Sequence, residues 1–198
     1  TPARIEAFAS PRIFKTHLTA AWVPEGPRCI AVVRDGRDVA VSYYHFYRSY
    51  LRFTGTFEEF FDRFLNGRLQ YGSWFSHVAG WRARAGDGDV LIVRYEELLD
   101  DRAAVVRRVA GFLDWPVDDA LVAEVARASS FEAMKANEVW FDHATALLLE
   151  RGVEPSSFLR AGQKGEGEAV VGSEREAFER AIRRARPRRE LWLPPFLQ

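Results

Sequence analysis

The chain has 198 residues, of which 47% are hydrophobic and 14% aromatic, a composition that excludes a disordered protein and suits one with a substantial core. Lysine plus arginine and aspartate plus glutamate both total 28, so the zero net charge gives no sign of a nucleic-acid or anionic-membrane partner. No apolar window approaches the roughly 20 residues of a membrane span, and the single cysteine excludes an intrachain disulfide framework. We therefore expect a soluble, cytoplasmic protein.

Short apolar runs rich in β-branched residues predict the strands. Cys29–Val33 and residues 90–93 are continuously apolar, which is typical of strands buried on both faces of a parallel sheet. Residues 12–16 are a weaker third candidate. Because helical patterns separate these runs, we predict an α/β protein with a parallel β-sheet flanked by helices. Residues 1–198 are expected to form a single domain.

Apolar residues at helical spacing predict the helices. The first of them spans residues 39–50 and follows directly after the strand Cys29–Val33. Asp118 and Ser129 stand where helix N-caps are expected. A glycine-rich loop is predicted at residues 160–172. Further helices are predicted at residues 57–65, 74–81, 103–113, 118–128, 131–137 and 173–186.

The turn between the first strand and the first helix predicts an anion site. Arg34 ends the strand, where ligands bind in parallel α/β sheets, and Gly36 is expected to permit a sharp turn. A guanidinium there grips a phosphate with two hydrogen bonds, and the Ser42 hydroxyl adds a third donor. The alternative is that Arg34 pairs with Asp35 or Asp38 while Ser42 faces solvent.

The sequence of residues 31–47, AVVRDGRDVAVSYYHFY, resembles the 3′-phosphate-binding signature of the cytosolic sulfotransferases. Five other segments match the family in its order: KTHL (15–18), YGSW (71–74), YEEL (95–98), SSFEAMKAN (129–137) and FLRAGQKG (158–165). The resemblance covers about residues 11–165, and residues 166–198 diverge into a lid and a C-terminal helix. It implies a P-loop-like, nucleotide-binding sulfotransferase fold.

The resemblance implies transfer of a sulfonate group from 3′-phosphoadenosine-5′-phosphosulfate (PAPS) to a hydroxyl or amine of a small molecule, with release of the 3′,5′-bisphosphate (PAP) and without a metal. Arg34 and Ser42 would bind the 3′-phosphate, and Arg160 with the backbone around Ala161 and Gly162 would close over it. The matched positions around the adenine are Tyr95, Ser129 and Phe131. Without the resemblance, these three look like core or cap residues and the loop like a flexible turn.

His17 is the candidate catalytic base, because a neutral imidazole accepts a proton near pH 7. Lys15 lies on the same side of an extended segment and is expected to direct its ammonium group at the sulfonate oxygens. The alternatives are a histidine that simply bonds nearby polar groups and a surface lysine. The other histidines, His45, His77 and His143, are interpreted as structural or pocket-lining.

The sequence also departs from the family. No Pro-Lys-Ser-Gly-Thr-Thr-Trp-like phosphosulfate loop is found before residue 11, so we expect the fold to be N-terminally incomplete. Ala161 replaces a lysine, and Gly167 and Glu168 stand where the family commonly has Trp-Lys. These departures leave an alternative open, a non-catalytic nucleotide-binding or interaction module that keeps only the 3′-phosphate site. An ATP- or GTP-hydrolysing protein would need G-x-x-x-x-G-K-[ST], which the sequence lacks.

Overall fold

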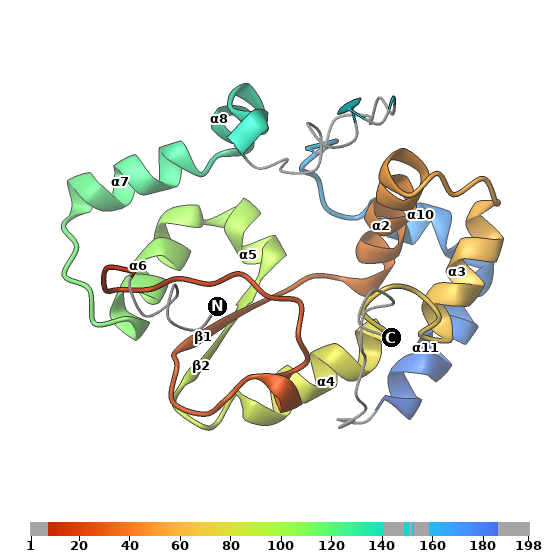
Figure 1. The fold of residues 1–198 in the computed structure, drawn as a ribbon, viewed down its shortest axis with the longest axis horizontal. Coiled ribbons are helices and arrows are strands. Elements are labelled where there is room, and N and C mark those ends of the chain that lie inside the picture. Colours follow the sequence, from red (N-terminus) through yellow and green to blue (C-terminus); the bar gives the residue numbers. More distant parts are fainter. Residues whose placement is uncertain (1–7, 141–148, 151, 153–158, 186–198) are drawn as a thin grey trace.

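The structure is a computed structural model that describes residues 8–140, 149–150, 152 and 159–185. Two strands, β1 (Cys29–Val33) and β2 (Val90–Arg94), pair in parallel. The helices α4 (Trp74–Arg84) and α6 (Arg102–Phe112) both contact β2 and lie on opposite sides of the strand pair in Figure 1. The predicted α/β fold, a parallel sheet flanked by helices, is therefore confirmed.

Most predicted helices form close to their predicted bounds. The first helix begins three residues earlier than predicted, directly after the turn that carries Arg34, and the helix predicted at residues 74–81 ends three residues later. The remaining elements, in chain order, are η1 (Ala20–Trp22), α2 (Gly36–Tyr50), α3 (Phe57–Leu65), α5 (Tyr95–Asp100), α7 (Asp119–Ala128), α8 (Phe131–Ala136), η2 (Glu138–Trp140), α10 (Glu166–Val170), η3 (Gly172–Glu174) and α11 (Arg175–Arg184).

Two predictions of local structure are wrong. Residues 12–16 form no strand: the described residues hold only the β1–β2 pair, and Ile13 and Phe14 are 80% and 58% exposed instead of packing in a sheet. The predicted loop 160–172 contains the helix α10, and the N–H groups of Gly165 and Gly167 at the start of this helix donate to Asp38 of α2.

Two predicted roles of single residues also change. Asp118 caps α7 as expected, but Ser129 is the C-cap that follows that helix, where its hydroxyl donates to the Val125 carbonyl, and Ser130 caps α8. Gly36 has no left-handed backbone. It is required for space, because a Cβ atom there would lie 2.6 Å from the Trp74 ring.

An aromatic core fixes α2 in place. Phenylalanines of α3, α4 and α11 pack together against α2, and α2, α3 and α11 gather at one end of the strand pair in Figure 1. A second, smaller core joins η1, α4 and the sheet. The start of α2 is thereby held at the carboxyl end of β1. The buried residues of the larger core are Ala40, Phe60, Phe61, Phe64, Leu69, Phe75, Val171 and Phe178.

Candidate functional site

Arg34 and Tyr95 meet beyond the carboxyl ends of the two strands. Val33 pairs with Arg94 in the sheet, so the residues that follow them leave the sheet side by side. The Arg34 guanidinium carbon lies 4.5 Å from the centre of the Tyr95 ring, a cation–π contact. The structure therefore brings together a predicted phosphate ligand and a predicted adenine neighbour, at the edge where ligands of parallel sheets bind.

Two carboxylates fix the turn that carries Arg34. The Asp35 backbone N–H donates to Glu96 Oε1 at 2.8 Å, which ties the turn to the start of α5. The Asp35 side chain caps α2 and accepts from the Arg37 guanidinium at 2.7 Å, and this bond lowers the pKa of Asp35. Asp35 is thus engaged with Arg37. Of the two carboxylates proposed as alternative partners of Arg34, only Asp38 contacts it, with its Oδ2 atom 3.3 Å from the guanidinium.

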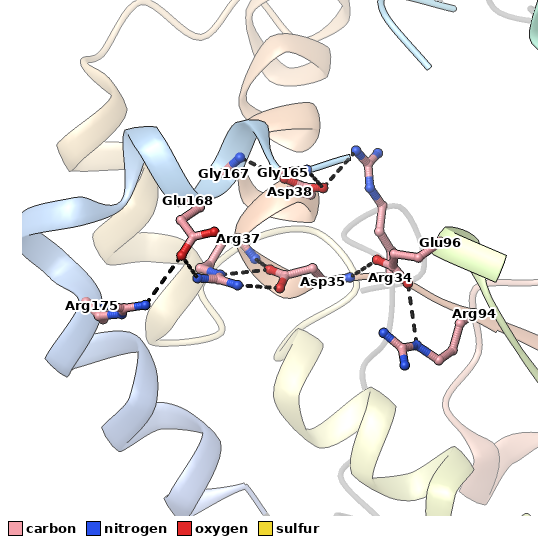
Figure 2. Close-up of polar contacts among 10 residues, drawn as sticks. All are labelled: Arg34, Asp35, Arg37, Asp38, Arg94, Glu96, Gly165, Gly167, Glu168 and Arg175. Carbon is pink, nitrogen blue, oxygen red and sulfur yellow. Dashed lines mark hydrogen bonds and ion pairs between the residues drawn. The ribbon is translucent and has the colours of Figure 1, made fainter. Parts of the chain in front are cut away.

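The segment of residues 160–167, here called the strap, lies directly against the start of α2 (Figure 2). Arg34 donates to the Gln163 carbonyl at 2.7 Å. Asp38, which is 3% exposed, accepts from the Gly165 N–H at 2.9 Å and from the Gly167 N–H at 2.7 Å. The structure therefore joins the two segments that the sequence assigned to one phosphate site.

The side of α2 directed at the strap carries Ser42. Asp38, Ser42 and His45 are one turn apart along the helix and share a face. Asp38 contacts the strap, and the charge of Arg160 contributes, after burial, to lowering the pKa of His45. Ser42 lies between these two contacts and is exposed. Arg160 itself forms an ion pair with Glu166 of the strap, which lowers the pKa of Glu166.

Phe131 and Gly162 are in close contact. The Gly162 backbone is left-handed, with φ of +63°, and a Cβ atom at this position would lie 2.3 Å from the Phe131 ring. A glycine is therefore required here for both conformation and space. Ala161 is half-buried beside it. Ser129, the third residue expected near the adenine, uses its hydroxyl within α7, so it offers an acceptor lone pair rather than a donor.

His17 lies in a segment without regular secondary structure. Its imidazole packs against the Tyr71 ring at a tilt of 35°, with 4.5 Å between ring centres. Desolvation by neighbouring atoms and the ammonium group of Lys15 lower the pKa of His17, although the residue is exposed at the surface. His17 in turn contributes, after burial, to lowering the pKa of His77. The imidazole is therefore biased toward the neutral form, which is the form that accepts a proton.

Sequence reasoning missed Tyr71 as a neighbour of His17. Its φ of +71° is unusual for a bulky residue. The preceding residue, Gln70, accepts from the Tyr43 hydroxyl at 2.8 Å and donates to the Tyr47 hydroxyl at 2.7 Å, so α2 holds the loop in place. No spacing in the sequence signals these contacts. His143 and Phe158, named from the sequence, lie outside the described residues.

Comparison with known proteins decides the family. Residues 1–183 match the family model of the sulfotransferase domain. The chain belongs to the sulfotransferase domain family. It is 37% identical over 165 residues to mouse Sulfotransferase 1B1, a match that covers 79% of this chain and 54% of that protein. It is 33% identical over 190 residues to human Sulfotransferase 1C2, which covers 91% of this chain and 64% of that protein.

Solved sulfotransferase structures share the fold. The mouse sulfotransferase SULT7A1 complexed with PAP superposes with a TM-score of 0.74 at 27% identity, over 92% of this chain and 69% of that chain. Retinol dehydratase in complex with androsterone and inactive cofactor PAP gives a TM-score of 0.74 at 23% identity, over 97% of this chain and 58% of that chain, which supports the fold alone. The family resemblance drawn from the motifs is confirmed.

Three facts bound the function of this sulfotransferase-family chain. It spans between about half and two thirds of the length of the two relatives named by sequence. Among the residues that the structure describes, no helix is long and apolar enough to span a membrane. The same part of the chain holds no cluster of three or more side chains suited to binding a metal ion.

Proposed function

We propose that the chain is the nucleotide-binding part of a PAPS-dependent sulfotransferase that transfers sulfonate to a hydroxyl or amine of a small molecule. The observation that carries this proposal is the position of Arg34, stacked on Tyr95 and joined to the strap beyond the carboxyl ends of both strands. A PAP complex of a relative with the same fold supports it. In this proposal, residues 1–198 act as one domain.

The residues around Arg34 suit the 3′-phosphate of a nucleotide. Arg34 still has hydrogen-bonding capacity, because its buried Nε atom has no partner among the described residues. Among the described residues, Arg160 forms its ion pair with Glu166, whose side chain is 36% exposed, and ion pairs at the surface contribute little. Ser42 and the backbone of Ala161 and Gly162 would add donors to the phosphate. Tyr95, Ser129 and Phe131 would surround the adenine, with ring faces for stacking and the Ser129 oxygen as an acceptor.

His17 and Lys15 would act on the transferred group. PAPS is the donor of the sulfonate group, and its phosphate is the leaving group. A new bond forms from sulfur to the acceptor oxygen or nitrogen as the bond from sulfur to the phosphate oxygen breaks, and the acceptor proton passes to a ring nitrogen of His17. The lowered pKa of His17 suits this role, since it keeps the imidazole unprotonated at neutral pH. Lys15 would stabilise charge on the sulfonate oxygens.

The acceptor is proposed only as a class, a small phenol, alcohol or amine. Retinol dehydratase, whose identity to this chain is 23%, has been solved in complexes with androsterone and with retinol. We also propose that the protein acts in the cytoplasm, where a single unpaired cysteine stays reduced. Binding of PAP without any transfer would instead favour the non-catalytic nucleotide-binding module.

Calorimetry with PAP tests the nucleotide site. We expect the chain to bind PAP and Arg34→Ala to weaken binding at least about 30-fold, because about 2 kcal/mol of charge-assisted hydrogen bonding to the phosphate is lost. Arg107→Ala is the matched control, since Arg107 is an exposed arginine that pairs with Asp119 outside the site. Equal affinity of the wild-type and Arg34→Ala proteins would overturn the assignment.

A further inference from the structure

Asp38 is the one buried charged side chain in the described part of the chain. A buried carboxylate is costly unless hydrogen bonds replace its water. Here both oxygens are used: Oδ1 accepts from the Gly167 N–H, and Oδ2 accepts from the Gly165 N–H and lies 3.3 Å from the Arg34 guanidinium (Figure 2). Each of these donors belongs to the strap or to the proposed phosphate site.

The strap approaches α2 more closely than a side chain would allow. A Cβ atom on Gly167 would lie 2.2 Å from the backbone carbonyl carbon of Arg37 and 2.4 Å from the Asp38 nitrogen. Gly165 has a left-handed backbone, with φ of +89°, which turns the strap into the start of α10. Where the family resemblance leads one to expect Trp-Lys, this chain has Gly167 and Glu168, and its strap is closed by backbone contact instead.

The contact between the strap and α2 fixes two arginines relative to each other. Arg34 stands at the end of β1 and is bonded to the Gln163 carbonyl within the strap. Arg160 enters from the other end of the strap and pairs with Glu166, between the two glycines that Asp38 binds. If the strap moved away from α2, the two guanidinium groups would separate, because no described element other than the strap carries Arg160.

We propose that Asp38 is a positioning residue for the phosphate site: it fastens the strap to α2 so that Arg34 and Arg160 converge on the 3′-phosphate of one nucleotide. This inference rests on the proposed function. Asp38 does not touch the ligand, since its oxygens are filled by the glycine N–H groups and by Arg34. Its effect on affinity is therefore specific to ligands that carry a 3′-phosphate.

The decisive measurement compares PAP with adenosine 5′-phosphate, which lacks the 3′-phosphate. We expect Asp38→Asn to weaken PAP binding tenfold or more and to leave the affinity for adenosine 5′-phosphate within about twofold, which corresponds to less than about 0.5 kcal/mol. General damage to the fold would weaken the binding of both ligands alike. Hydrogen exchange of the Gly165 and Gly167 amides is expected to accelerate in the same variant, because asparagine cannot accept from both.

Two further variants complete the test. Gly167→Ala pushes the strap from α2 while keeping the carboxylate, so it should reproduce the selective loss of PAP affinity even if Asp38→Asn does not fold. Glu168→Gln is the matched control in α10, directly after the strap, since the Glu168 side chain is 64% exposed and its ion pairs with Arg37 and Arg175 lie at the surface. It should leave both affinities and the amide exchange unchanged.

The outcomes separate this inference from the proposed function. Suppose that the wild-type protein binds PAP and that Asp38→Asn and Gly167→Ala both fold. If the ratio of the affinities for PAP and adenosine 5′-phosphate is then unchanged in both variants, the role of Asp38 is overturned and the nucleotide site still stands. Absence of PAP binding by the wild-type protein would overturn the proposed function and this inference with it. A selective loss of PAP affinity in either variant supports both.

Discussion

The proposed phosphate site around Arg34 and the proposed catalytic segment around His17 are built in different ways. Arg34 follows a strand, precedes a capped helix, stacks on Tyr95 and is bonded to a strap that lies 129 residues away in sequence. His17 lies in a segment whose residues 8–18 are all exposed and form no regular element, and its contact with the Tyr71 ring comes from a loop.

This difference predicts that nucleotide binding and sulfonate transfer depend on different parts of the fold. The phosphate site is positioned by elements that have their own core and by a buried carboxylate. The catalytic segment depends on the loop that α2 holds through Tyr43 and Tyr47. Substitutions around Arg34 should therefore change mainly the affinity for nucleotide, and substitutions around His17 mainly the rate of transfer.

The largest expected effect is on the rate. His17→Ala in the complete gene product should lower sulfonate transfer by about 100-fold or more, because general-base catalysis typically contributes at least that factor. PAP affinity should stay at the wild-type value, since no predicted phosphate ligand touches His17. The measurement is transfer of labelled sulfonate over a panel of phenols, alcohols and amines, with calorimetry on the same variant. Full activity would assign the proton to another base.

A smaller effect is expected in the phosphate site. Gly162→Ala should weaken PAP binding roughly tenfold, about 1.4 kcal/mol, because the added methyl group meets both a left-handed backbone and the Phe131 ring. Gly88→Ala is the control, since Gly88 has a similar φ of +77° but no atom within 4 Å of an added Cβ. Equal PAP affinity in Gly162→Ala and wild type would show that contact with Phe131 does not shape the site.

Local sequence patterns predicted most of the elements, because strands and amphipathic helices repeat over a few residues. They succeeded for Cys29–Val33 and Phe57–Leu65 and failed for residues 12–16, where an apolar run has no strand beside it among the described residues. Whether such a run pairs with another strand depends on which segments lie beside it in the fold. The spacing of apolar residues within the run gives no information on those segments.

The candidate site could also be predicted only in part from the sequence. Arg34 was predicted as a ligand residue because it follows a strand, whereas Tyr95 was named only through the family resemblance; the pairing of the two strands is what brings them together. The contacts of Asp38 with Gly165 and Gly167 were not predictable, because they join residues more than 120 positions apart, and an aspartate in the first turn of a helix is already explained by the helix dipole. The family resemblance located the strap, but a departure from the family, Gly167, determines how this strap packs.

The smallest expected effect concerns the ionisation of His17. The imidazole is desolvated by its surroundings, packs against the Tyr71 ring, and has the positive charge of Lys15 and the ring of His77 as neighbours. A positive neighbour disfavours the imidazolium, so Lys15→Gln should raise the pKa of His17, while desolvation keeps it below its ordinary value. A histidine titration followed by NMR measures this shift, and Arg12→Gln serves as the control on the same segment. A pKa that stays constant or falls would mean that Lys15 directs its charge away from His17. Lys15 could then not act on the group that His17 deprotonates, and the two residues would no longer form one catalytic pair.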